Sequence, residues 1–217
     1  MPRTTRAAGG QTPKRALMTG LAKFVSAVLH PLCMPLLTLG LLLATDGYLV
    51  HRLGLFAYLF VLLFINTLAP ALSMFILKKR GVISDWDIRM RHERPWPFLL
   101  VLAYYLMAYV LVVNSTAVEV PLFYQNVLLS LVVAIASAWV VTWKAKISMH
   151  MLAQGGIMGV YLHVAMTDQM WSLGWVSLLL LVAGLVGWSR LHLSAHTPGQ
   201  VYAGYVLGVA TVWITLF

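Results

Sequence analysis

Seven long runs without a charged side chain dominate this sequence and limit what the chain can fold into. Most of them have 20 or more residues, and a helix needs roughly 20 apolar residues to cross the hydrocarbon core of a bilayer. Because the mean hydropathy is +0.85 and only 10% of the residues are charged, the chain is not an ordinary soluble domain. The sequence predicts an all-α polytopic membrane bundle of about six or seven transmembrane helices. The runs are 24–45, 53–77, 96–113, 120–143, 147–167, 169–189 and 197–217.

The first run differs from a secretory signal peptide, since its apolar stretch is too long and lacks a small-residue cleavage site. Pro31 and Pro35 interrupt it, so we expect a kinked helix that stays in the protein. Residues 1–16 before it form a basic tail, which we predict to be disordered and cytoplasmic. Residues 17–217 then form a single integral-membrane domain.

The net charge of +9 raises the question of a nucleic-acid partner, but the distribution of basic residues points to a membrane. If the N-terminus lies inside, the inner connections hold 14 of the 15 lysines and arginines, and the outer ones hold only Arg52. This asymmetry follows the positive-inside rule. We therefore expect no nucleic-acid partner, and an integral protein of the bacterial inner membrane with a cytoplasmic N-terminus. The sequence carries no indication of the oligomeric state.

Three stretches between the apolar runs carry the polar residues that stand out: the loop 78–95, the segment 144–150 and the segment 189–200. In a seven-helix topology all three lie on the same side of the membrane, just before the third, fifth and seventh helices. Charged groups in or beside a bilayer are costly and usually serve a function. These stretches are therefore the first place to look for a site.

The helices that follow these stretches carry sequence signals of helix N-termini. Pro95 and Pro198 suit the first turn of a helix, and Ser148 and Thr197 suit the N-cap. Three helix N-termini around one pocket present backbone N–H groups and positive dipole ends, which attract an anion. Arginine adds a planar donor fork that matches phosphate. The predicted anion is phosphate, and the arginines are Arg94 and Arg190.

Other polar residues have simpler explanations. A lone histidine such as His30, His51 or His163 is more often a packed or interfacial side chain than a ligand, and loop arginines are usually topology determinants. Asp85 and Asp87 resemble part of a metal site, but such a site needs a second acidic cluster and the chain has six acidic residues in all. We expect no metal. Four side chains that are costly to place in or beside a bilayer are expected to come together, and a functional site is favoured there. They are Arg94, His150, Arg190 and His196.

These residues resemble the motifs of the type 2 phosphatidic acid phosphatase (PAP2) superfamily, which also includes the vanadium haloperoxidases. The superfamily motifs are K-x6-R-P, P-S-G-H and S-R-x5-H-x3-D. The resemblance implies a divergent integral-membrane member with a PAP2-like core, and it is most specific over 144–217. The matching residues are Arg94 and Pro95 in the first motif, Ser148 and His150 in the second, and Ser189, Arg190 and His196 in the third.

The first two motifs are incomplete. Asp87 stands where the first motif has its lysine, so another base must help to hold the phosphate. Arg91 is the first choice, because it lies one helical turn before Arg94 if the segment is helical, and Arg89 is the second. In the second motif, apolar residues replace the proline and the glycine, which removes no side-chain chemistry.

The resemblance implies a metal-independent phosphatase without a cofactor. His196 attacks phosphorus and forms a phosphohistidine, and His150 protonates the leaving oxygen as the general acid. Gln200 replaces the aspartate that orients the nucleophile. Its amide oxygen can accept from Nδ1–H and leave Nε2 free, but it lacks the charge that stabilises an imidazolium. We therefore expect a slow but real phosphatase. The residues implied to stabilise the phosphate oxygens are Arg94, Arg190, Arg91 and Ser148.

The implied substrate is a membrane lipid with a terminal phosphate or diphosphate, because the site lies at the level of the headgroups. The sequence does not choose among undecaprenyl diphosphate, phosphatidylglycerol phosphate, phosphatidate and lipid A phosphate. One alternative is a catalytically weak or inactive relative that binds or translocates phosphorylated lipids. Another is a small transporter or assembly subunit, in which the glycines of 155–159 and 204–208 serve close helix packing. The second alternative leaves the histidines unexplained.

Overall fold

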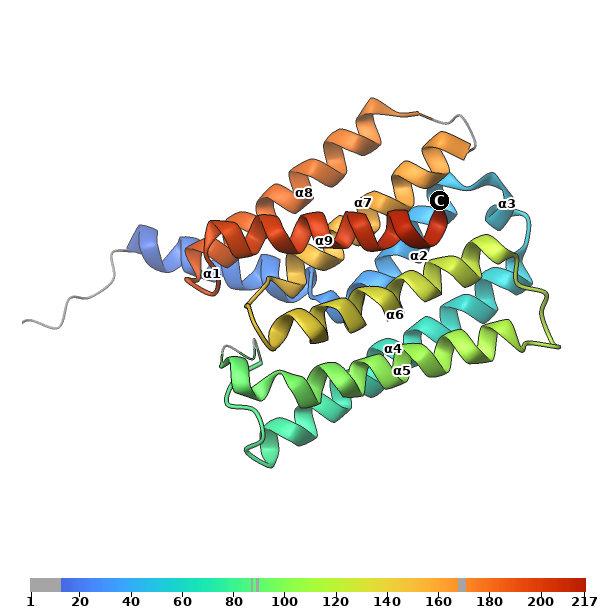
Figure 1. Ribbon diagram of the computed structural model, residues 1–217. Coiled ribbons are helices and arrows are strands. Elements are labelled where there is room, and N and C mark those ends of the chain that lie inside the picture. Colours follow the sequence, from blue (N-terminus) through green and yellow to red (C-terminus); the bar gives the residue numbers. More distant parts are fainter. Residues whose placement is uncertain (1–12, 87, 89, 168–170) are drawn as a thin grey trace, which may run out of the picture.

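The computed structural model describes residues 13–86, 88, 90–167 and 171–217, and these residues form helices joined by short connections, with no strand among them (Figure 1). The predicted all-α bundle is confirmed. The helices are α1 (Pro13–Val28), the 3-10 turn η1 (Pro31–Cys33), α2 (Met34–Thr45), α3 (Gly47–Val50), α4 (Leu53–Lys79), the 3-10 turn η2 (Arg91–Glu93), α5 (Pro95–Val113), α6 (Leu122–Thr142), α7 (Met149–Thr167), α8 (Leu173–His192) and α9 (Pro198–Leu216).

Six helical stretches of the described chain are long and apolar enough to cross a membrane, which makes this an integral membrane protein. They are Pro13–Thr45, α4, α5, α6, α8 and α9. The remaining apolar run, 147–167, forms α7, which does not reach the same hydropathy. Most of its side chains are buried, because α2, α6, α8 and α9 pack around it. A helix that meets protein on most sides needs less apolar surface than one that faces lipid.

The first apolar run is broken where the prolines predicted it. α1 ends at Val28, His30 caps the short turn η1, and α2 continues with Pro35 in its first turn. The start of α1 differs from the expected boundary of the tail. Helix begins at Pro13, so the last residues assigned to a disordered tail are helical; proline at the first helical position is favourable. Residues 1–12 lie outside the described residues.

α7 and α9 pack so closely that four of their glycines, Gly155, Gly159, Gly204 and Gly208, have no space for a side chain. A Cβ atom on Gly155 would strike the backbone of Tyr205, and one on Gly208 would strike the backbone of Leu152. The Ser148 backbone N–H also donates to the Gln200 carbonyl across the two helix starts, at 3.1 Å. The close packing predicted for these glycines is confirmed, and it holds the second and third polar stretches against each other.

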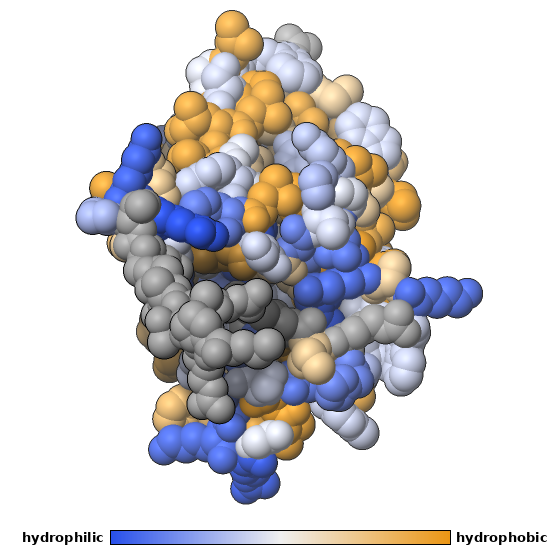
Figure 2. Space-filling model, turned by 90° about the vertical axis from the view of Figure 1, so that its left-hand side faces the viewer, coloured by the Kyte–Doolittle hydropathy of each residue, from blue (hydrophilic) through white to orange (hydrophobic). Residues whose placement is uncertain are grey.

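The three polar stretches lie at one end of the bundle. Because successive helices alternate in direction, α5, α7 and α9 all begin at the left-hand end in Figure 1. Figure 2 looks onto this end, where hydrophilic side chains stand over the helix ends among apolar ones. The described basic residues of α1 and of the end of α4 lie there too, whereas Arg52, at the start of α4, lies at the opposite end.

Candidate active site

Arg94 is a buried arginine that ties the loop before α5 to the start of α7. It is the N-cap residue of α5, with Pro95 in the first turn, and its side chain is only 2% exposed. Nε donates to the Ile88 carbonyl at 2.9 Å, and Nη1 donates to the Ile147 carbonyl at 3.3 Å. Ile88 adopts a φ of 45°, which is unfavourable for a β-branched residue. Strain of this kind is common at sites where the surroundings hold the backbone for a function.

The turn between α8 and α9 places the third motif. Ser194 adopts a left-handed φ of 51°. Its N–H bonds to the Leu191 carbonyl at 2.9 Å, and the next N–H, of Ala195, bonds to the Arg190 carbonyl at 3.0 Å. These two bonds form a Schellman motif, with serine where glycine is usual. This motif ends α8 shortly after Arg190 and reverses the chain. His196 therefore lies in the short connection between α8 and α9, at the polar end of the bundle.

Arg190 is held by a chain of buried hydroxyls. Its Nη1 donates to Ser26 Oγ at 3.1 Å, and Ser26 Oγ lies 2.9 Å from Ser189 Oγ. Because the Ser189 hydroxyl donates to the Val186 carbonyl at 2.8 Å, the Ser26 hydroxyl must donate to Ser189. Arg190 is 1% exposed and Ser189 is fully buried, so this directional chain fixes one edge of the guanidinium.

His150 lies in the first turn of α7 and faces α1. Its Nε2 is 3.1 Å from the Ser26 carbonyl oxygen, and since a carbonyl only accepts, Nε2 carries a hydrogen. The ring of His30 lies edge-on to the ring of His150, with centroids 5.3 Å apart. Nδ1 of His30 accepts from the Leu32 backbone N–H at 3.3 Å. The α1–η1 break therefore adds a second imidazole to the site.

The geometry around His196 assigns its tautomer. Nδ1 of His196 is 3.1 Å from Gln200 Oε1, and the same oxygen accepts from the Thr197 backbone N–H at 3.3 Å. Because that N–H can only donate, the amide oxygen and not the amide nitrogen faces both groups. Nδ1 of His196 therefore carries the hydrogen when the ring is neutral, and Nε2 holds a lone pair.

His196 is neutral at physiological pH. Burial lowers the pKa of its imidazole from the ordinary 6.5 to about 4, and the hydrogen bond with Gln200 only partly opposes this shift. The positive charges of Lys146, Arg190 and Arg94 lower the pKa further. A neutral imidazole with an unprotonated Nε2 is the form that can attack an electrophile.

Lys146 is a further base at the site. It precedes α7, is half-buried, and its Nζ donates to the Ala195 carbonyl at 2.9 Å, just before His196. The side chain of Arg91, expected to complete the phosphate clamp, lies outside the described residues, as do Asp87 and Arg89. Lys146 thus adds a described cation next to His196, on whose ring its charge acts.

The predicted site residues that the structure describes take three kinds of position. Arg94, His150, Arg190 and His196 line one cavity, as does His30. Gln200 stands behind His196 and bonds to its ring. Ser148 is fully buried, and its hydroxyl accepts from the Met151 N–H at 3.4 Å as the N-cap of α7. Ser148 is therefore placed to cap the helix and not to line the cavity.

Three residues of the site were not predicted from the sequence: Ser26, His30 and Lys146. His30 could have been found in the sequence, because it directly precedes Pro31 in the middle of an apolar run. A proline there interrupts the helix, and the interruption leaves backbone groups next to the His30 side chain. Lys146 stood in a polar stretch that was already singled out. Ser26 had no signal, since one serine on a helix is common and its partners come from α7 and α8.

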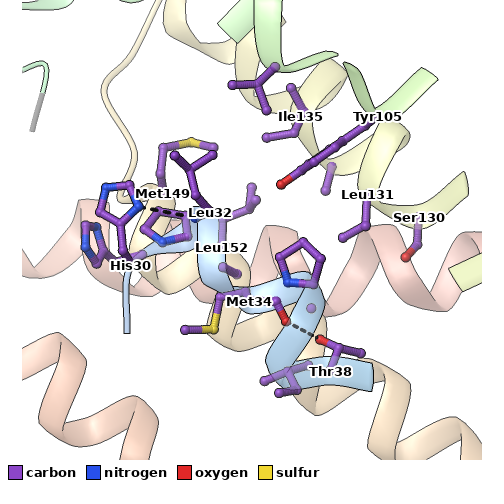
Figure 3. A pocket seen from close by; sticks show the side chains of 18 of the residues that line it. His30, Leu32, Met34, Thr38, Tyr105, Ser130, Leu131, Ile135, Met149 and Leu152 are labelled. Carbon is purple, nitrogen blue, oxygen red and sulfur yellow. Dashed lines mark hydrogen bonds between the residues drawn. The ribbon is translucent and has the colours of Figure 1, made fainter. Parts of the chain in front are cut away.

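The cavity behind these residues is apolar and reaches into the bundle. It has a volume of about 160 Å³. His30 lies at one side of it in Figure 3, and mostly apolar side chains of α2, α4, α5, α6, α7 and α9 line the rest. The fold and the site define a polytopic membrane protein whose internal apolar cavity opens beside three histidines and two buried arginines. In comparisons with protein-family models, curated proteins and solved structures, no match to this chain was found.

Proposed function

We propose that this protein is a membrane lipid phosphatase and a divergent member of the PAP2 superfamily. It hydrolyses a terminal phosphate or diphosphate of a lipid through a phosphohistidine. The observation that supports this most is the state of His196: a neutral ring whose Nδ1 bonds to Gln200 lines the same cavity as Arg94, Arg190 and His150. A nucleophile, phosphate-binding cations and a second imidazole are the groups that such a reaction requires.

The reaction proceeds in two balanced steps. His196 Nε2 attacks phosphorus, the P–O bond to the lipid breaks, and the leaving oxygen takes a proton from His150. A water molecule then attacks the phosphohistidine and gives its proton to His150, the P–N bond breaks, and inorganic phosphate leaves. The charge on the phosphate oxygens is balanced by Arg94, Arg190 and Lys146, so the protein's own cations supply the electrostatic stabilisation.

The site belongs at the membrane surface on the side that carries most basic residues. The described charges at this end are those of the polar stretches and of α1, while Arg52 lies at the other end. By the positive-inside rule this end is cytoplasmic, and in a bacterium the protein lies in the inner membrane with its N-terminus inside. A phosphorylated lipid then reaches the site with its headgroup at the level of the arginines.

Phosphate release from lipid phosphates by the purified protein in detergent tests the proposal. We expect wild-type turnover, a loss of at least ~10²-fold in His150→Ala, the scale of a general acid, and no measurable turnover in His196→Ala. His51→Ala is the control, because His51 lies at the opposite end of the bundle, and it should retain full activity. Turnover by His196→Ala at the wild-type rate would exclude the phosphohistidine mechanism.

A lipid-binding or translocating protein without turnover is the second candidate, and the amide at Gln200 favours it. An amide orients the imidazole as a carboxylate does but adds no negative charge to stabilise a phosphohistidine. If the wild-type protein releases no phosphate from any lipid yet retains a lipid phosphate in native mass spectrometry, this second function replaces the first.

A further inference from the structure

The cavity holds a third histidine, His30, which the proposed two-step reaction does not use. Its ring lines the cavity together with His150 and His196. It comes from the break between α1 and η1, in the middle of the first apolar run. A polar side chain inside an apolar membrane segment is costly and usually serves a function. What its two ring nitrogens can do therefore indicates what His30 is for.

One ring nitrogen of His30 belongs to the fold. His30 is the N-cap residue of η1, and its Nδ1 accepts from the Leu32 backbone N–H at 3.3 Å, the bond that Figure 3 draws. Because a backbone N–H only donates, Nδ1 carries no hydrogen, and the hydrogen of the neutral ring lies on Nε2. A second hydrogen, on Nδ1, would break this cap. His30 is therefore suited to donate from Nε2 and not to carry protons between other groups.

The donor side of the ring is turned away from η1. In an imidazole ring the Nε2–H bond and the Nδ1 lone pair point in nearly opposite directions. Since Nδ1 is directed at the Leu32 N–H, Nε2–H is directed away from that turn of backbone. The ring is half-buried at the cavity wall, so its donor side belongs to the cavity and not to the packing of η1.

His30 stands beside two groups that the proposed reaction uses. Ser26, four residues before it, bonds to both of them: the Ser26 carbonyl accepts from His150 Nε2 and the Ser26 hydroxyl accepts from Arg190 Nη1, each at 3.1 Å. The His30 ring meets the His150 ring edge-on, with centroids 5.3 Å apart and ring planes at 80°. The end of α1 thus gathers one arginine and two imidazoles. A phosphate bound by Arg190, with its leaving oxygen at His150, lies next to His30.

A helix cap alone does not require a histidine. Asparagine, aspartate and serine are the side chains favoured at N-caps, and each supplies an oxygen that accepts from the backbone. What histidine adds at this position is a donor on the far side of its ring. Hydrogen bonds from such donors to an anion are among the strong ones, and the anion predicted for this cavity is a phosphate.

We propose that His30 is a third functional histidine of this site and that its Nε2–H donates a hydrogen bond to a phosphoryl oxygen of the bound lipid. His30 contacts the substrate but gives up no proton, so the acid–base steps stay with His150. This inference rests on the proposed phosphatase function. It adds to that function a substrate-binding residue that lies outside the three sequence motifs.

The test compares His30→Asn and His30→Ala with the wild type in phosphate release from a diacylglycerol phosphate. Asparagine can keep the cap, because its side-chain oxygen accepts from the Leu32 N–H, but its short amide does not reach the position of Nε2–H. Alanine removes both the cap and the donor. We expect kcat/KM to fall ~10- to 100-fold in both variants, the effect of one hydrogen bond to a charged group. The melting temperature in detergent should fall only in His30→Ala.

The pH profile separates a fixed donor from a proton carrier. In His30→Asn we expect kcat/KM to fall by the same factor at every pH, with both limbs of the profile where the wild type has them. A lost or shifted limb would show that His30 itself exchanges a proton in the reaction, which overturns the proposal. Wild-type kcat/KM in His30→Asn would overturn it too, because only the cap would then matter. The control is His51→Asn, the same substitution at the opposite end of the bundle, which should change neither rate nor profile.

The length of the lipid tail gives a second control. A contact with the phosphoryl group acts on every lipid phosphate alike, so His30→Asn should lower kcat/KM by the same factor for a long-chain and a short-chain diacylglycerol phosphate. A loss confined to the long-chain lipid would place His30 against the tail and refute the phosphate contact.

Failure of this inference is distinguishable from failure of the phosphatase. If the wild type releases phosphate and His30→Asn does so equally well, the phosphatase stands and the role of His30 is refuted. If the wild type releases no phosphate, the phosphatase fails, and retention of the lipid phosphate in native mass spectrometry then decides the role of His30. Weaker retention by His30→Asn than by the wild type supports the contact. Equal retention, or none by the wild type, refutes it.

Discussion

Replacing Gln200 by leucine removes the oxygen that accepts the hydrogen bond from His196 Nδ1. In the wild type that oxygen lies 3.1 Å from Nδ1 and also accepts from the Thr197 N–H. Without it the ring is free to rotate and to exchange its hydrogen to Nε2, the atom that we propose attacks phosphorus. Leucine has a similar size, so the packing of α9 against α7 changes little. The main loss falls on the orientation of His196; the lost bond to the Thr197 N–H, part of the capping box of α9, lowers the stability of the fold by about 1 kcal/mol.

The loss of an orienting partner behind a functional imidazole typically costs 10- to 100-fold. We expect kcat of Gln200→Leu to fall by ~10- to 100-fold, with KM changed little, because Arg94 and Arg190, the proposed phosphate-binding residues, are unchanged. Gln125→Leu is the matched control, since the amide of Gln125 bonds to the Val120 carbonyl at the other end of the bundle. Steady-state phosphate release on a single lipid phosphate measures both variants. Wild-type turnover by Gln200→Leu would refute the orienting role.

Gln200→Asp separates orientation from charge. The carboxylate keeps an acceptor for Nδ1–H and adds a negative charge, which raises the pKa of His196 above its value of about 4. In the proposed mechanism His196 attacks as the neutral ring, so activity is expected to fall as the pH drops through that pKa. We expect the acid limb of kcat/KM near pH 4 in the wild type and at higher pH in Gln200→Asp, with activity near neutrality retained or raised. An acid limb at the same pH in both proteins would contradict this.

Three further predictions test the framework of the site. Gly208→Ala should lower the melting temperature in detergent, because its Cβ would strike the Leu152 backbone. Such overpacking costs about 1–3 kcal/mol. Gly184→Ala is the control and should not lower the melting temperature, because its Cβ meets nothing within 4 Å. Ser194→Gly should keep or raise the melting temperature, since glycine adopts the left-handed φ of 51° without strain, and a lower value would contradict the Schellman turn. Single cysteines at 85, 146 and 194 should react from the cytoplasmic side and one at 116 from the opposite side, and labelling of 116 with the others would refute the topology.

The sequence by itself determined the class of fold and the end of the bundle that carries the site. Hydropathy is a local property, so each apolar run predicted a helix before any packing was known. Pro31 predicted the break in the first run, and Pro95 and Pro198 predicted two helix starts. Because consecutive membrane helices alternate in direction, the order of the runs alone placed the three polar stretches at the same end.

Only the tertiary structure decided which side chains meet there. Ser26 reaches Arg190 and His150 because α1 packs on α8 and ends beside α7. No local pattern encodes that contact between distant parts of the chain. The same holds for Tyr105, one of several aromatic residues in an apolar run, whose hydroxyl points into the cavity only because the helices pack as they do. A hydropathy pattern reports which residues avoid water, whereas a site depends on the directions in which particular side chains point, and helix packing sets those directions.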